Sequence, residues 1–244
     1  MDVRFADCRY DLANPAAARA RYLEGHIPGA AFLDLDRDLS DLSIPADAGG
    51  RHPLPSAGQF AEVAGRAGIG PETLVVAYDE RMTGGAARLW WLLRHFGHDR
   101  VAVLDGGLET WLGLLAQGEE RIEPAVFTPN ARSDDTATTE EIYARLGDPG
   151  LVLLDARSED RFRGEVAGLD PAAGHIPGAL NVPFTLGATA PADVLDAKEI
   201  VCYCGSGVTA CVTLLALHRA GRTDACLYPG SWSEWSRKGL PTER

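Results

Sequence analysis

Short apolar runs alternate along the chain with segments of helical character. Residues 74–78, 152–154 and 200–203 are apolar runs of this kind, and polar or glycine-rich turns follow them. Such alternation predicts an α/β fold, in which a parallel sheet is covered by helices on both faces. Ligands of these sheets bind beyond the carboxyl ends of the strands, which is where Cys204 follows the run 200–203.

Two segments carry the N-terminal signature of a helix. Ser56 is placed to cap a helix in "PSAGQFAEVAGRAGIGPET" (55–73), which would end near Gly68. Thr138 and Glu141 have the spacing of a capping box at the start of "TTEEIYARLG". We therefore expect helices to begin directly after residues 56 and 138.

The chain contains two copies of one pattern. Four motifs recur in the same order: "FADCR" as "LLDAR", "GHIPGAAFLDLD" as "GHIPGALNVPF", "LVVAYD" as "EIVCYC", and "LDGGLETW" as "YPGSWSEW". The second copy is about 24 residues shorter between its second and third motifs. The helix expected in 55–73 should therefore be missing there, or replaced by the short connection 186–199.

The repeat divides the chain into two domains. Residues 119–135 are polar, contain two prolines and have no helical period, as is typical of a linker. We place the N-terminal domain at 1–122, the linker at 123–137 and the C-terminal domain at 138–244. Each domain should hold its own parallel sheet.

The composition of the chain narrows the range of possible binding partners and cellular compartments. The formal net charge is −12, which argues against nucleic acid or an anionic membrane as the main partner. No run of 18 apolar residues predicts a transmembrane helix, and "MDVRFADCRY" does not resemble a secretory signal. Five cysteines in 244 residues do not suggest a disulfide framework, so we expect a reduced, cytoplasmic protein.

The loop "CGSGVT" (204–209) has the composition of an anion-binding nest. Its two glycines allow a tight turn, and its N–H groups, followed by a helix N-terminus, favour an anion or a thiolate. Phosphatases and arsenate reductases that cradle a cysteine in this way need an arginine six positions later, and Ala210 stands there instead. The remaining class moves a sulfur atom, which Cys204 would hold as a persulfide.

These motifs together resemble the tandem-domain rhodanese family. The duplicated "HIPGA", the "CGSGVTA" loop and the "DGG…W" and "PGSWSEW" segments carry the resemblance, which is nearest to the 3-mercaptopyruvate sulfurtransferase branch. It implies two rhodanese-like domains, of which the first is non-catalytic because Asp79 replaces the cysteine. It also implies covalent catalysis by Cys204 without a metal or an organic cofactor.

The resemblance also implies substrate-binding residues. Arg161 in "RFRG" would bind the substrate carboxylate through its forked guanidinium. The loop residues Gly205, Gly207, Val208 and Thr209 would surround the transferred sulfur.

One position departs from the mercaptopyruvate branch. A second arginine is usual some nine residues after the first, and here that position is Asp170. Either another arginine, such as Arg163, takes its place, or the preferred donor differs.

The same branch implies a serine–histidine–aspartate system. At matching positions it would consist of Ser206, His52 and Asp36, assisting formation of the pyruvate enolate. The alternative is that His52 and Asp36 have a purely structural role. His26, His175 and the pairs Asp7–Arg9 and Asp155–Arg157 occur in both copies and are expected to be structural.

Several cysteines and tryptophans have less specific contexts. Cys202 should point to the same side of its strand as Cys204, as a packed core residue rather than a resolving thiol. Trp232 is a candidate for a pocket wall. The remaining residues of these two types are expected to be structural: Cys8, Cys211, Cys226, Trp90, Trp91, Trp111 and Trp235.

The predicted activity is transfer of sulfane sulfur from 3-mercaptopyruvate to cyanide, a small thiol or a protein of the thioredoxin type. Two alternatives remain open. One uses thiosulfate as the donor, against which the neutral Gly205–Ser206 pair argues. The other is a persulfide carrier module that does not turn over small donors.

Overall fold

The computed structural model describes residues 2–81, 83–166, 168–186 and 192–244. Its contacts divide the chain into two compact units. The first comprises Met1–Asp41 and Pro55–Arg132, and the second comprises Leu42–Leu54 and Ser133–Arg244. The segment 42–54 therefore belongs to the unit that contains Cys204.

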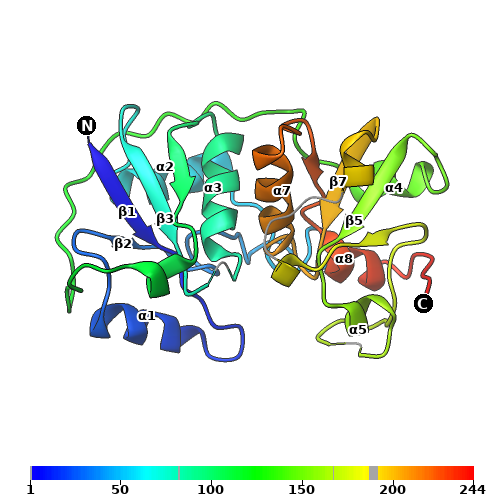
Figure 1. The fold of residues 1–244 in the computed structure, drawn as a ribbon, viewed down its shortest axis with the longest axis horizontal. Helices are drawn as coiled ribbons and strands as arrows, with labels where there is room; N and C mark the ends of the chain where they lie inside the picture. The colour runs from blue at the N-terminus through cyan, green and yellow to red at the C-terminus, as the bar shows by residue number, and fades with distance from the viewer. Residues whose placement is uncertain (1, 82, 167, 187–191) are drawn as a thin grey trace. The chain divides into compact units, whose positions relative to one another are not determined.

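The first unit follows the predicted alternation of strands and helices (Figure 1). Its elements are β1 (Val3–Asp7), α1 (Pro15–Glu24), β2 (Ala31–Phe32), α2 (Ala57–Arg66), β3 (Leu74–Tyr78), α3 (Gly85–His95), β4 (Val101–Val103) and the 3₁₀ helix η1 (Gly107–Thr110).

The second unit repeats this alternation. Its elements are α4 (Thr139–Ala144), β5 (Leu151–Asp155), α5 (Glu159–Phe162), β6 (Leu180–Asn181), the 3₁₀ helix η2 (Phe184–Leu186), α6 (Ala192–Leu195), β7 (Glu199–Tyr203), α7 (Ala210–Arg219), β8 (Cys226–Leu227) and α8 (Ser231–Arg237). The ten-residue helix α2 has the four-residue α6 at the corresponding place in the second copy.

Both sheets have the same topology, which confirms the α/β class. Within the described residues each sheet has four parallel strands, in the orders β2-β1-β3-β4 and β6-β5-β7-β8. The registers also correspond, because Asp7 pairs with Tyr78 in the first sheet and Asp155 with Tyr203 in the second. Asp79 and Cys204 are therefore equivalent, since each directly follows the third strand of its unit.

The predicted helix starts are confirmed. The Ser56 and Thr138 side chains both accept the N–H of the third helical residue, whose side chain returns to the cap's backbone. These two capping boxes satisfy N–H groups that the helices themselves leave unpaired. Local sequence therefore determined where α2 and α4 begin.

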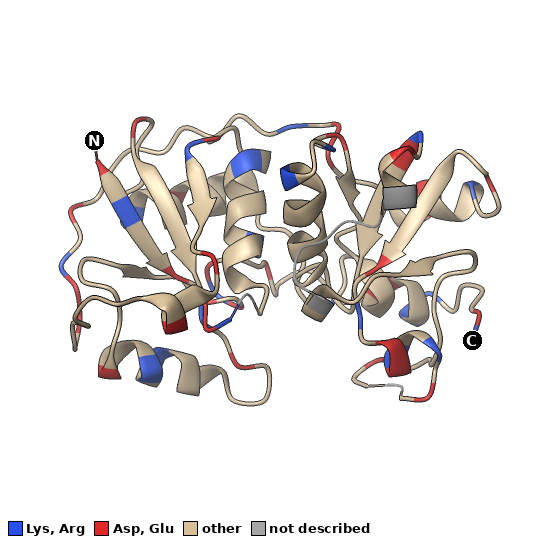
Figure 2. Cartoon of the chain, viewed as in Figure 1, with Lys and Arg blue, Asp and Glu red and all other residues tan. Residues whose placement is uncertain are grey.

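Helices cover the sheets through apolar faces. Helix α3 packs against β3 and β4, and α7 packs against β7 and β8 (Figure 1). Figure 2 shows α7 without charged residues along most of its length, in keeping with its burial from residue 210 to residue 217. A helix that is apolar on nearly every side must be enclosed, so α7 and the loop before it are held firmly.

The core of the second unit contains both tryptophans of α8. Trp232 and Trp235 are fully buried among Leu153, Val201 and Tyr203. In the first unit Trp90 and Trp91 are buried, whereas Trp111 is half-buried against Phe5.

No helix in the described part of the chain is long and apolar enough to cross a membrane.

Candidate active site

The site is built around the loop that joins β7 to α7. Strand β7 ends at Tyr203, and Cys204 begins the loop that leads to Ala210, the first residue of α7. Cys204 is 1% exposed, so the thiol lies at the base of the site rather than on the surface. This is the predicted position at the carboxyl end of a parallel strand.

Helix α8 anchors the loop by hydrogen bonds. The N–H of Cys204 donates to Ser231 Oγ at 3.2 Å, and the carbonyls of Cys204 and Gly205 each accept an N–H from α8 at 3.0 Å. Gly207 has φ +76°, and a Cβ at this position would lie 2.6 Å from the carbonyl oxygen of Pro229. Only glycine fits this turn without moving the backbone.

The loop presents unused donors. Among the residues that the structure describes, the backbone N–H groups of Gly205, Ser206, Val208 and Thr209 have no hydrogen-bond acceptor. They precede the N-terminus of α7, where the helix dipole also favours negative charge. The loop can therefore stabilise an anion carried by Cys204.

Two guanidinium groups lie over the same loop. A Cβ at Gly205 would lie 2.9 Å from Nη2 of Arg51 and 3.2 Å from Nη2 of Arg161. Burial, together with the positive charges of Arg157 and Arg51, lowers the pKa of Arg161. Both arginines are thus adjacent to the loop of the thiol, and the role of Arg161 in binding a substrate carboxylate stays a prediction.

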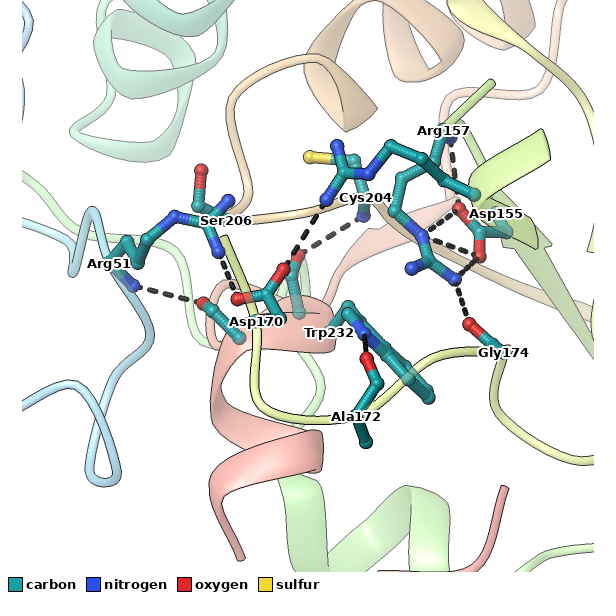
Figure 3. Close-up of polar contacts among 12 residues, drawn as sticks. Arg51, Asp155, Arg157, Asp170, Ala172, Gly174, Cys204, Ser206 and Trp232 are labelled. Atoms are coloured by element: carbon teal, nitrogen blue, oxygen red, sulfur yellow. Dashed lines mark hydrogen bonds and ion pairs between the residues drawn. The ribbon is translucent and has the colours of Figure 1, made fainter. Parts of the chain in front are cut away.

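Asp170 joins these arginines. Its side chain is 0% exposed, and Oδ1 pairs with Arg51 (Figure 3). Oδ1 also pairs with Arg237 at 3.3 Å, and Oδ2 accepts from Arg161 at 3.3 Å. Sequence reasoning did not identify Arg51, although its neighbour His52 was a candidate. It also could not foresee that Asp170 lies among three arginines.

Arg163 does not replace the second arginine. Its guanidinium pairs with Glu159 and Glu165, each at 3.3 Å, and its side chain is 53% exposed. Arg51, which is distant in the sequence, lies beside Arg161 instead.

Ser206 and His52 are brought together. His52 Nδ1 lies 2.7 Å from Ser206 Oγ, and both residues are 6% exposed. Asp36 belongs to the other unit, where its N–H donates to Asp34 Oδ1 at 3.0 Å. The assignment of Asp36 as the third member therefore stays a prediction.

Asp79 fills the equivalent loop of the first unit. Its Oδ2 accepts N–H groups from Gly84 at 3.0 Å and Ala86 at 3.2 Å, at the N-terminus of α3. A fixed carboxylate thus takes the donors that an anion would use. The first unit offers no thiol at this position.

The paired charges that occur in both copies hold the fold. Nε and Nη2 of Arg157 donate hydrogen bonds to the carboxylate of the fully buried Asp155 (Figure 3). The same guanidinium donates to the carbonyl of Gly174 and lies 4.6 Å from the ring centre of Trp232. Arg9 and Asp7 form the same pair in the first unit. These contacts support the structural interpretation of both pairs.

Three of the other cysteines are poorly suited to reaction. Burial raises the pKa of Cys8 and Cys202 well above the usual value, and burial with acidic neighbours raises that of Cys226 to about 11. All five cysteines are thiols in the structure.

The histidines of the two "HIPGA" motifs are buried, and each has a ring nitrogen 2.8 Å from a backbone carbonyl oxygen.

Two features define the class of protein: a four-stranded parallel sheet that occurs twice, and a cysteine loop after the third strand of the second copy. The family model for the rhodanese-like domain matches residues 1–114 and 138–238. The chain therefore belongs to the rhodanese family, as the sequence motifs indicated.

Individual relatives make the comparison more specific. The chain is 44% identical over 254 residues to a probable 3-mercaptopyruvate sulfurtransferase from Pseudomonas aeruginosa, covering 96% of this chain and 89% of the relative. It is 34% identical over 267 residues to a thiosulfate sulfurtransferase from Rattus norvegicus, covering 99% and 88%. The crystal structure of SseA from Escherichia coli, described as a 3-mercaptopyruvate sulfotransferase, superposes with a TM-score of 0.79 at 33% identity, covering 94% and 92%. The resemblance to the mercaptopyruvate branch is confirmed.

Proposed function

We propose that this protein is a sulfurtransferase that takes the thiol sulfur of 3-mercaptopyruvate and holds it as the sulfane sulfur of a persulfide on Cys204. The arrangement around Cys204 carries the proposal. In the described part of the chain, the N–H groups of Gly205, Ser206, Val208 and Thr209 have no acceptor, and two guanidinium groups lie over this loop. The loop supports a thiolate and, after reaction, a persulfide anion. The guanidinium groups support binding of a small anionic donor.

The first half-reaction moves the sulfur to the enzyme. The Cys204 thiolate attacks the sulfur of mercaptopyruvate, so that an S–S bond forms and the C–S bond breaks. The electron pair of the broken bond goes to carbon, and pyruvate leaves as its enolate. The enolate then takes a proton on carbon, which leaves pyruvate and the Cys204 persulfide.

Several side chains are proposed to assist this step. Arg161 and Arg51 can bind the donor carboxylate through forked hydrogen bonds, which fixes the direction of the reactive sulfur. Ser206, close to His52, can hydrogen-bond the keto oxygen as negative charge develops there. Asp36 is proposed to orient His52, as the family resemblance implies.

The second half-reaction releases the sulfur. Cyanide, a small thiol or a protein of the thioredoxin type attacks the terminal sulfur of the persulfide, and the Cys204 thiolate leaves. Five cysteines that are all thiols fit a reducing compartment, so we propose that the reaction takes place in the cytoplasm.

A second candidate donor is thiosulfate. The relative from Rattus norvegicus is named as a thiosulfate sulfurtransferase, and the arginines over Gly205 could bind its anionic oxygens. The thiosulfate reaction has no carbonyl for Ser206 to polarise. We therefore favour mercaptopyruvate, because the Ser206–His52 contact then has a chemical role.

The test compares the two donors directly. Pyruvate release from 3-mercaptopyruvate and thiocyanate formation from thiosulfate with cyanide are measured for the wild type and Cys204→Ser. We expect at least tenfold faster turnover of mercaptopyruvate, lost in the variant, and a mass increase of one sulfur on Cys204 without acceptor. Preference for thiosulfate would move the protein to the second candidate. If neither donor is turned over, while a persulfidated protein still transfers sulfur to Cys204, the protein is a persulfide carrier.

A further inference from the structure

We propose that Asp170 is a positioning residue that sets donor selectivity, because it holds Arg51 and Arg161 in place and neutralises one of the positive charges around it. The site would thereby favour a monoanionic carboxylate over a dianion such as thiosulfate. This inference rests on the proposed function and specifies the substrate class of the same site.

The charge balance of the cluster supports the proposal. Asp170 is fully buried and contacts Arg51, Arg161 and Arg237, so one negative charge stands among three positive charges. A buried carboxylate is retained only where it is paired and hydrogen-bonded, and here both of its oxygens are used. Without this charge, the net positive charge of the cluster beside Gly205 would increase by one unit.

The geometry supports a positioning role. The carboxylate occupies only part of each guanidinium: it takes Nη1 of Arg51 and Nη2 of Arg161. Nε of Arg161 is buried and has no hydrogen-bond partner among the described residues. The backbone of Gly168 packs against this guanidinium, since a Cβ there would lie 3.2 Å from Nε. The nitrogens that Asp170 does not take, Nη2 of Arg51 and Nη1 of Arg161, lie beside Gly205 and remain as donors for a substrate, while the planes of both groups are restrained.

Arg51 is held from two sides. Its backbone N–H donates to Ser233 Oγ at 2.9 Å, and its guanidinium pairs with Asp170. These contacts fix both ends of a long side chain, which lowers the entropy lost when a substrate binds.

Selectivity follows from the way binding energy depends on charge. A dianion gains about twice as much as a monoanion from one added unit of positive potential. Removing the Asp170 charge should therefore strengthen binding of dianions, while freeing the arginines should weaken alignment of a carboxylate. Both effects shift selectivity in the same direction.

The test replaces Asp170 by Asn, which keeps the shape and removes the charge. We expect the ratio of kcat/KM for mercaptopyruvate to that for thiosulfate to fall at least tenfold, about 1.4 kcal/mol, with most of the change in KM. Glu165→Gln is the matched control, because it removes a carboxylate that pairs with the exposed Arg163. A ratio within twofold of the wild type, or an equal shift in the control, would overturn the proposal.

A binding measurement separates this inference from the proposed function. Protection of Cys204 against iodoacetamide is measured with sulfate, an inert dianion, and with pyruvate, a monoanionic carboxylate. Asp170→Asn should shift relative protection at least tenfold towards sulfate, even if neither donor is turned over. An unchanged ratio would refute the role of Asp170, whereas loss of turnover alone would refute only the proposed reaction.

A second variant keeps the test decisive if Asp170→Asn does not fold. Arg237→Gln removes a positive charge from the same carboxylate, so protection should shift at least threefold towards pyruvate. A shift towards sulfate, or none, would contradict the charge argument.

Discussion

Substitution by alanine should have different effects at the two glycines of the loop, Gly205 and Gly207. At Gly207 a methyl group would meet backbone, 2.6 Å from the carbonyl oxygen of Pro229, and the residue has φ +76°. At Gly205 φ is not in the left-handed region, and the nearest atom is the end of the Arg51 side chain at 2.9 Å. Gly207→Ala should therefore damage the fold, whereas Gly205→Ala should displace a substrate-binding side chain.

The magnitude for Gly207→Ala has two parts. Left-handed backbone costs an alanine about 1–2 kcal/mol, and overlap with a fixed backbone oxygen adds about 1–3 kcal/mol. The free energy of unfolding should therefore fall by roughly 2–5 kcal/mol, which lowers the melting temperature by about 5–15 °C. For Gly205→Ala the flexible guanidinium can move aside, so the melting temperature should change by no more than about 3 °C.

Calorimetry and steady-state kinetics on the same preparations test this pair. Gly205→Ala should raise KM for mercaptopyruvate about tenfold, because the Arg51 and Arg161 guanidinium groups must shift away from the loop. The reasoning is refuted if Gly207→Ala melts within 2 °C of the wild type, or if Gly205→Ala melts as low as Gly207→Ala.

Further predictions concern the thiols, the serine and a buried histidine. Because the pKa of Cys226 is raised to about 11, brief treatment with iodoacetamide at pH 7.5 should label Cys204 first, as read by peptide mass spectrometry; faster labelling of Cys226 would contradict this. Ser206→Ala should lower kcat for mercaptopyruvate by about 10–100-fold and leave thiosulfate turnover within about threefold, whereas equal losses would exclude a role at the keto group. Burial lowers the pKa of His98, so the unfolded state binds more protons below pH 6.5 and the melting temperature should fall as the pH drops from 7 to 5. That fall should be smaller in His98→Gln, and an identical pH profile would remove His98 as a cause.

Much of the fold follows from local and repeated sequence. The four recurring motifs predicted two copies of one domain, and the sheets have identical strand orders. The capping boxes at Ser56 and Thr138 predicted where two helices begin, because both partners lie within four residues of each other. The replacement of cysteine by Asp79 was also readable, since the strand before it aligns directly with the strand before Cys204.

The surroundings of Cys204 were only partly predictable. The loop glycines and the following helix indicated an anion site, because nests and helix N-termini are local structures. The pattern also placed Arg161 beside the site, through its resemblance to family members. It suggested Arg163 as a second arginine, and that residue instead pairs with its own neighbours along the chain.

The sequence by itself therefore determined the duplication, the strand that ends at the cysteine and the loop that cradles it, because these depend on periodicity, glycine and short-range hydrogen bonds. Only the tertiary structure decided which charges meet at the site. Asp170 is 119 residues from Arg51, and Ser206 is 154 residues from His52. Contacts over such separations depend on how the chain packs segment 42–54 with the second sheet, and no local pattern specifies the partner of a buried charge.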